Sequence, residues 1–236
     1  MKKDNNEVDE ISIFVADESH LPYVQTILTT IEEAAKIRGT GIAKRTPDYI
    51  ELKMRERKAI IALTGDGQFA GFCYIETWGD KKFVANSGLI VVETFRGHGL
   101  AKRIKQKAFQ LSRERYPDAK IFGLTTGLAV MKINSELGYR PVTFSELTDD
   151  EAFWKGCQSC VNYDILQRTH RKHCLCTGML FDPAWNKESE EEKSKNTANT
   201  LVVKPVKKPV KIVAKVVSPK KKSKKKPGSK LMINLL

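Results

Sequence analysis

The feature that most constrains this chain is a glycine-rich turn between an apolar segment and an amphipathic one, Arg96-Gly97-His98-Gly99-Leu100-Ala101. The apolar segment before it, Leu89–Val92, has the composition of a buried strand. After the turn, apolar residues recur at helical spacing, while the other face of that predicted helix carries four basic residues. The apolar set is Leu100, Ile104, Ala108 and Leu111, and the basic set is Lys102, Arg103, Lys105 and Lys107.

Glycines in such a turn let consecutive backbone N–H groups point into one concavity, and a helix start adds unpaired N–H groups and partial positive charge. The turn therefore predicts a pyrophosphate site. The small Ala101 allows close approach of the first helical turn, and Arg96 and Lys102 supply charge that neutralises phosphate. The alternative is a turn of the same composition that binds no ligand.

The pattern of the whole chain predicts an α+β fold. A strand and two helices precede a three-stranded antiparallel meander, and a helix, a strand, a helix and a last strand follow. We expect a mixed, mostly antiparallel central sheet flanked by helices, with a Cys-rich C-terminal insertion. The predicted strands are 11–16, 59–63, 69–78, 83–92, 120–125 and 177–181, and the predicted helices are 24–35, 47–54, 100–111, 128–137 and 148–154.

Charge divides the chain into a nearly neutral part and a basic part. The formal charge is +13, and residues 186–236 hold 15 Lys against 4 acidic residues. We expect a flexible N-terminus at 1–10, one domain at 11–185 with a Cys-rich segment at 145–176, and a disordered basic tail at 186–236. That tail predicts weak contact with nucleic acid or another polyanion, unless it is an appendage without a specific role.

No run of apolar residues approaches the ~18 that a membrane helix needs. Residues 1–10 are charged and lack the apolar core of a signal peptide. These observations predict a cytoplasmic protein without a membrane partner, whose five Cys are reduced. No pattern in the sequence indicates an oligomeric state.

Two motifs resemble the GNAT superfamily of N-acetyltransferases: the strand 89–92 with Arg96-x-x-Gly99-x-Ala101, and the helix end Glu136-Leu137-Gly138-Tyr139. The resemblance covers about Ile11 to Phe144. It implies acetyl-CoA or another acyl-CoA as cofactor, and transfer of an acetyl or succinyl group to a primary amine of a small molecule. By this resemblance the pantetheine arm pairs with the strand in a form of strand addition, and the pyrophosphate sits on the turn. The implied pantetheine residues are Val91 and Val92, and the implied pyrophosphate residues are Gly97, His98, Gly99, Leu100 and Ala101.

The sequence departs from the family at the usual proton donor. Members commonly carry Tyr four residues before the glycine of that helix end, where this chain has Asn134. Because an amide is not an acid, protonation of the departing thiolate is left to Tyr139, Ser135, a Cys or water.

Glu76 is the candidate general base. It lies near the end of an apolar, aromatic strand, Cys73–Trp78, where desolvation is expected to raise the pKa of a carboxyl group. The alternative is a glutamate at the end of a strand that faces water.

A basic, glycine-punctuated loop supplies the candidate acceptor site. Arg38, Lys44 and Arg45 have the charge to clamp carboxylates, which favours an acidic amino acid such as glutamate. The alternative is a solvated basic loop. Residues 38–46, together with Trp154-Lys155-Gly156-Cys157, are similar to small GNAT proteins linked to N-acylglutamate formation in arginine biosynthesis.

Four cysteines fall in one short region, Cys157-x-x-Cys160 and Cys174-x-Cys176. Four thiolates suit tetrahedral zinc, and a metal ion fixes an otherwise irregular segment. The sequence therefore predicts a structural zinc site, with partly buried free thiols as the alternative.

Two rival functions remain open. The first is a protein or peptide N-acetyltransferase that its basic tail localises. The second is a non-catalytic, nucleic-acid-associated protein that binds CoA, against which the nearly neutral domain argues.

Overall fold

The computed structural model describes residues 11–38 and 45–185, except for the side chain of Arg38. The predictions for residues 1–10 and for the tail at 186–236 therefore fall outside the described residues. The described residues belong to one unit, which spans Met1–Ser194.

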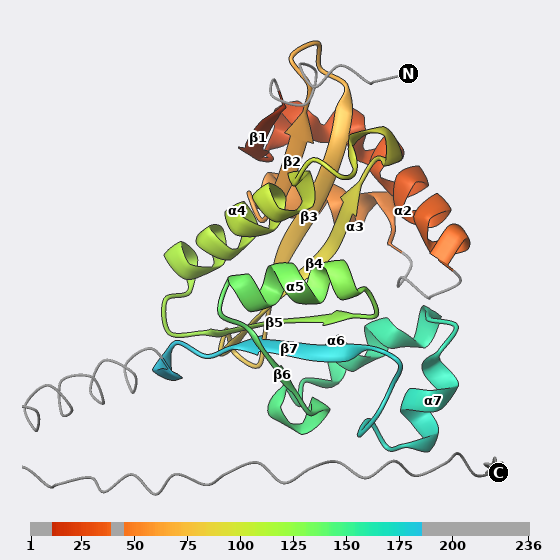
Figure 1. Ribbon diagram of the computed structural model, residues 1–236, viewed down its shortest axis with the longest axis vertical. Coiled ribbons are helices and arrows are strands. Elements are labelled where there is room, and N and C mark those ends of the chain that lie inside the picture. The colour runs from red at the N-terminus through yellow and green to blue at the C-terminus, as the bar shows by residue number, and fades with distance from the viewer. Residues whose placement is uncertain (1–10, 39–44, 186–236) are drawn as a thin grey trace, which may run out of the picture. The chain divides into compact units, whose positions relative to one another are not determined.

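A seven-stranded sheet forms the centre of this unit, in the order β1-β2-β3-β4-β5-β7-β6 (Figure 1). Neighbouring strands are antiparallel except for β4 and β5, which are parallel. The prediction of an α+β fold with a mixed, mostly antiparallel sheet is confirmed. The strands are β1 (Ser12–Val15), β2 (Ala59–Leu63), β3 (Phe69–Trp78), β4 (Phe83–Val91), β5 (Lys120–Thr125), β6 (Arg140–Val142) and β7 (Thr177–Phe181).

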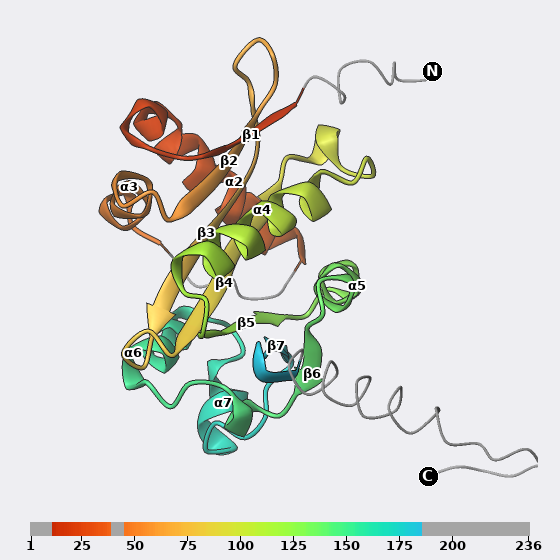
Figure 2. The ribbon, with the colours of Figure 1, turned by 90° about the vertical axis from the view of Figure 1, so that its left-hand side faces the viewer.

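Helices cover both faces of the sheet. The view in Figure 2 shows α2 and α3 on one side of β2–β4 and α4 on the other. No helix within the described ranges is long and apolar enough to span a bilayer. The α-helices are α2 (Val24–Arg38), α3 (Pro47–Arg55), α4 (Leu100–Arg115), α5 (Leu128–Glu136), α6 (Glu151–Lys155) and α7 (Tyr163–Arg168), with 3-10 turns at Glu18–Tyr23, Glu93–Phe95, Phe144–Glu146 and Gly156–Ser159.

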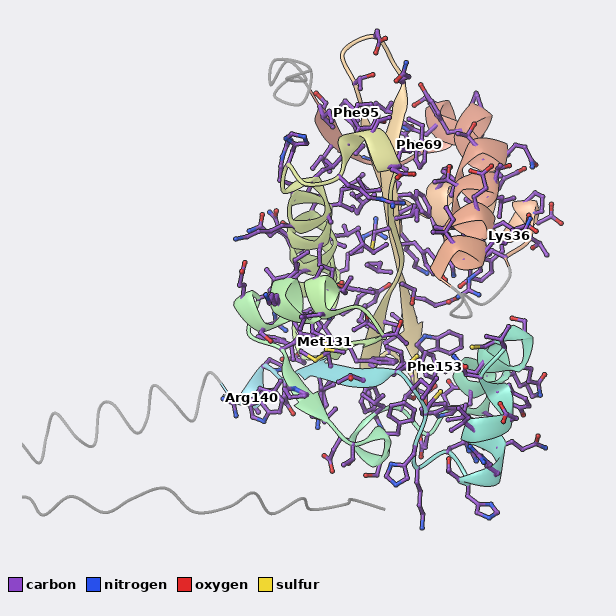
Figure 3. The ribbon with its side chains drawn as sticks, turned by 45° about the vertical axis from the view of Figure 1, so that its right-hand side comes forward. Lys36, Phe69, Phe95, Met131, Arg140 and Phe153 are labelled. Carbon is purple, nitrogen blue, oxygen red and sulfur yellow. The ribbon has the colours of Figure 1, made fainter. Side chains whose placement is uncertain are left out.

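Successive side chains of β3 point to opposite faces of the sheet and so belong to the two main layers of the core. Cys73 and Ile75 pack in the cluster with Ile104 of α4, whereas Phe72 and Tyr74 pack in the cluster under α2 and α3. A third cluster joins the far end of the sheet to the segment between β6 and β7, and Phe153 of α6 lies at the foot of β3 and β4 (Figure 3). Its ring centroid is 5.6 Å from that of Trp78.

The sheet divides between β4 and β5. Their pairing runs from Phe83–Lys120 to Ala85–Phe122, and none is found beyond it in the described part of the chain. Just past that point β4 bulges, because Gly88 and Leu89 together oppose Cys73. Gly88 has φ +67°, and a Cβ there would lie 2.6 Å from the Tyr74 ring, so glycine is required. The gap between residues 86–91 of β4 and 123–125 of β5 is called the split below.

One strand and one α-helix were not predicted. Strand β6 contains Pro141, which a strand tolerates here because β6 is at the edge of the sheet. Helix α7 is short and follows an irregular stretch. The predicted helix from 148 begins later, because Asp150 caps it by accepting a hydrogen bond from the Ala152 amide.

Candidate active site

The glycine turn has the backbone shape that an anion site requires. Gly97 and Gly99 have φ of +87° and +77°, and Gly99 is the N-cap of α4. No atom lies within 4 Å of a Cβ built at either glycine, so the space above both is open. The start of a 16-residue helix adds its own unpaired N–H groups. Residues 97–101 therefore offer a cradle of backbone donors that fits a pyrophosphate.

The side chains beside the turn are held by other parts of the chain. Arg96 Nε donates to the Val91 carbonyl at 3.0 Å. Lys102 Nζ lies 2.7 Å from a carboxylate oxygen of Glu136 in α5. Both cations that are predicted to neutralise phosphate thus already have a partner within the protein. The Val92 amide donates to Ala70 of β3. Of β4, residues 85–89 line the cavity described next, and Val91 and Val92 do not.

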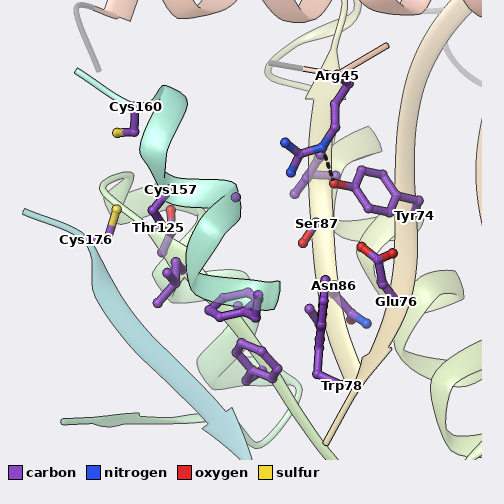
Figure 4. Close-up of a pocket in the computed structure, with 18 of the residues that line it drawn as sticks. Arg45, Tyr74, Glu76, Trp78, Asn86, Ser87, Thr125, Cys157, Cys160 and Cys176 are labelled. Atoms are coloured by element: carbon purple, nitrogen blue, oxygen red, sulfur yellow. Dashed lines mark hydrogen bonds between the residues drawn. The ribbon is translucent and has the colours of Figure 1, made fainter. Parts of the chain in front are cut away.

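A cavity of about 480 Å³, here called the slot, runs through the split. One wall comes from β3 and β4, with Glu76, Trp78 and Ser87, and the other comes from β5, α6 and the turn after α6 (Figure 4). Cys157, Cys160 and Cys176 stand on that opposite wall. The slot reaches both faces of the sheet, because it is lined by residues from α3 and from α4. Its volume suits a small ligand.

On the α3 side, Glu76 is engaged by two donors. Lys53 Nζ lies 2.5 Å from one carboxylate oxygen, and Tyr49 donates its phenolic hydrogen to the other. Arg45 Nε donates to the Tyr74 hydroxyl at 2.6 Å, and its guanidinium lies over both tyrosine rings. Burial raises the pKa of Tyr49 and of Tyr74, so both phenols stay protonated at neutral pH. Glu76 is therefore a positioned carboxylate that faces the slot, and not a strand-end residue in open water.

Of the three predicted acceptor-binding cations, the structure places one in the slot. Arg45 lines the slot directly before α3. Arg38 ends α2, and its side chain is not among those described. Lys44 lies outside the described residues.

Two buried polar atoms in the slot's walls have no hydrogen-bond partner among the described residues: Asn134 Oδ1 of α5 and Trp78 Nε1 at the end of β3. Buried polar groups are normally paired, so a ligand that reaches these walls can satisfy them. Tyr139, one candidate proton donor, is 2 % exposed and donates to Asn86 Oδ1 at 3.0 Å. Burial raises its pKa, which makes it a poor acid.

The four clustered cysteines lie near one another between β6 and β7. Burial, followed by the neighbouring thiols, raises the pKa of Cys157 to about 11 and that of Cys176 to about 12. Cys174 donates to the Asn162 carbonyl. Across residues 11–38 and 45–185, no group of three or more His, Cys, Asp or Glu side chains is arranged to hold a metal ion. This arrangement does not support the predicted zinc site formed by Cys157, Cys160, Cys174 and Cys176.

The sequence reading missed several residues of the slot. It assigned Lys105 to the solvent face of its helix, but Lys105 is 2 % exposed and lines the slot. Tyr49 and Lys53 were not singled out, although their i, i+4 spacing places them on one side of a helix. Gly88 was a usable signal, since a glycine inside a strand often marks a bulge.

Part of the chain matches a family model. Residues 28–129 match the model of the acetyltransferase (GNAT) family. No curated protein matches the chain by sequence.

Several solved structures share the fold. N-acetylglutamate synthase from Neisseria gonorrhoeae, complexed with coenzyme A and N-acetyl-glutamate, is 16% identical with a TM-score of 0.51, over 73% of this chain and 35% of that one. Rv2747 from Mycobacterium tuberculosis, in complex with CoA, is 15% identical with a TM-score of 0.52, over 72% and 98%. A GNAT-family acetyltransferase from Staphylococcus aureus Mu50 is 17% identical with a TM-score of 0.50, over 60% and 91%. The chain thus spans about a third of the Neisseria enzyme, and these identities show the fold alone.

Proposed function

We propose that the chain moves an acyl group from acyl-CoA to the amine of a small amino acid that carries a carboxylate, such as glutamate; the match of residues 28–129 to the model of the acetyltransferase (GNAT) family supports this. That match supports the enzyme class, an acyl-CoA N-acyltransferase. The identity of the acceptor goes beyond this match and is argued below from the walls of the slot.

The observation that carries the proposal is a slot that crosses the sheet where β4 and β5 part. The glycine turn lies at the start of α4, on one face, and the cluster of Arg45, Tyr49, Tyr74 and Glu76 faces the slot from the α3 side. A thioester that enters from the α4 face can therefore meet an amine that enters from the α3 face. Such positioning supplies much of the rate of a two-substrate reaction.

The walls of the slot favour a small, acidic acceptor. Arg45 presents a guanidinium, whose planar donors suit a carboxylate, and its contacts with Tyr74 and Tyr49 fix its orientation. Phe153 and Cys157 close the opposite wall, which limits the space for a folded protein surface. In support, the Neisseria structure that shares this fold holds coenzyme A and N-acetyl-glutamate.

In the proposed reaction the amine nitrogen attacks the thioester carbonyl, a C–N bond forms and the C–S bond breaks. Glu76 takes the proton that the amine loses, directly or through one water. Lys53 and Tyr49 hold its carboxylate in place. Asn134 is not an acid, and Tyr139 is buried and bonded to Asn86, so the proton for the departing thiolate is left to water, Ser135 or a Cys. We assign the polarisation of the carbonyl to N–H groups of the β4 bulge, which lies beside the slot.

A mass-spectrometric screen tests the acceptor. The full chain is incubated with acetyl-CoA or succinyl-CoA and each of the twenty amino acids, and in parallel with lysine-rich peptides. We expect N-acylated product with glutamate or aspartate, and little with neutral or basic amino acids. Product on peptides alone would contradict the proposed acceptor and favour a protein N-acetyltransferase.

A further inference from the structure

A buried lysine faces the slot from α4. Lys105 is 2 % exposed, yet it lines the slot, and no hydrogen bond or ion pair to its ammonium occurs within the described residues. Its neighbour is an aromatic face, since Nζ lies 5.2 Å from the centroid of the Tyr139 ring. Burial lowers the pKa of Lys105 to about 8, with a small opposing effect from the Cys73 thiol.

The ammonium lies at the vertex of the split. A Cβ built on Gly123, the residue after the last β5 partner of β4, would be 3.9 Å from Nζ. Cys73, which lies opposite the β4 bulge, is also a neighbour of the Lys105 ammonium. Lys105 therefore lies deep in the slot, where the two strands separate.

A cofactor arm that starts at the glycine turn is directed to this point. Helix α4 runs antiparallel to β4: Ile104 packs against Gly71, the partner of Val91, and Ser112 accepts from Asn86 Nδ2. From Val91 back to Asn86 is five residues, or ~17 Å of strand. An acyl chain at the end of an arm that follows β4 thus points at the Lys105 ammonium.

An unpaired ammonium is costly to bury, and a carboxylate is the partner that offsets this cost most directly. We propose that Lys105 selects the acyl donor by pairing with a carboxylate at the far end of the acyl chain, so that the enzyme prefers a short dicarboxylic acyl-CoA, such as succinyl-CoA, over acetyl-CoA. This inference rests on the proposed function, because it requires an acyl-CoA in the slot.

The test compares two donors in two variants. The ratio of kcat/KM for succinyl-CoA to that for acetyl-CoA is measured with one acceptor in the wild type, in Lys105→Met and in Lys107→Met, a control two residues along the same helix. The wild type favours succinyl-CoA. Lys105→Met lowers kcat/KM for succinyl-CoA about tenfold to a hundredfold, the range expected for a charged hydrogen bond, and changes that for acetyl-CoA less than threefold. Lys107→Met changes neither.

Equal losses with both donors would overturn the inference, because they indicate that Lys105 protonates the thiolate or only supports the fold. If the wild type uses acetyl-CoA at least as well as succinyl-CoA, the inference fails while the proposed function stands. If neither donor is used with any acceptor, both fail.

A binding measurement covers the case in which Lys105→Met does not fold. Calorimetry on the wild type at pH 7 should show that succinyl-CoA binds at least about tenfold more tightly than acetyl-CoA. Equal affinities would contradict the assignment.

Discussion

The proposed donor site and the proposed acceptor site offer different kinds of contact to a ligand. On the α4 side, the glycine turn offers backbone amides from consecutive residues, and its side chains Arg96 and Lys102 are occupied elsewhere. On the α3 side, Arg45, Tyr49 and Glu76 act through side chains that α3, the residues before it and β3 bring together. A site made of local backbone depends on a few glycines, whereas a site made of distant side chains depends on the whole packing around it.

The same difference explains what the sequence could predict. The turn at 96–101 was recognisable because all its determinants are adjacent: a strand, two glycines and an amphipathic helix. The cluster around Glu76 depends on α3 packing against β3, which no local pattern encodes. Glu76 itself was found from its place in an aromatic strand, but Tyr49 and Lys53, which hold it, were not.

The largest expected loss of activity comes from the proposed acceptor site, at Glu76. Glu76→Gln keeps the size of the side chain but removes the proton acceptor, so we expect kcat to fall about a hundredfold or more. Steady-state kinetics measure this, with Glu51→Gln as control, since Glu51 is a carboxylate of α3 that pairs with Arg55 outside the slot. A loss under threefold with the fold intact would remove Glu76 from the mechanism.

In the glycine turn, Gly99→Ala should weaken CoA binding about tenfold. A side chain at φ +77° costs ~1–2 kcal/mol, and relaxation of the turn moves its amides away from the pyrophosphate. Calorimetry gives the dissociation constant. Gly67→Ala is the matched control, because Gly67 has φ +85° in the β2–β3 turn. Both variants should lose similar stability, and an equal loss of CoA affinity in both would contradict a specific role for the turn.

Arg45→Met is expected to affect binding of the acceptor and not binding of CoA, which separates the two sites. We expect KM for the acidic acceptor to rise about tenfold, because one charged hydrogen-bonding partner is lost, while the dissociation constant for CoA stays the same. Kinetics at saturating donor separate KM from kcat. An unchanged acceptor KM would show that the carboxylate is bound elsewhere.

A smaller effect is expected from pH. Lys105 is charged below its lowered pKa of about 8 and neutral above it, whereas the acyl carboxylate is ionised throughout. The groups that face it, Cys73 with a pKa raised to about 11 and Tyr139 with a raised pKa, stay neutral in this window. KM for succinyl-CoA should therefore rise severalfold between pH 7 and 9, relative to KM for acetyl-CoA. Parallel profiles for both donors would contradict it.

Lys105 also shows where pattern reading fails. It follows Ile104 directly, and the periodicity of α4 assigned it to the polar face with Lys102, Arg103 and Lys107. The slot extends beneath α4, so a residue beside the apolar stripe becomes buried. A cavity cannot be inferred from helical periodicity, because its walls are set by the divergence of β4 and β5. The Cys pattern shows the same limit, since ligand-like spacing did not produce a metal-binding arrangement.

The most direct test of the account is amide hydrogen exchange on the full chain with and without saturating CoA. We expect slower exchange in peptides that cover residues 86–89 and 97–101, because the cofactor occupies those N–H groups. Peptides from β6 and α7 should exchange at unchanged rates. Bound CoA without protection of 97–101, or no CoA-dependent change at millimolar ligand, would contradict the central claim that this backbone holds the donor.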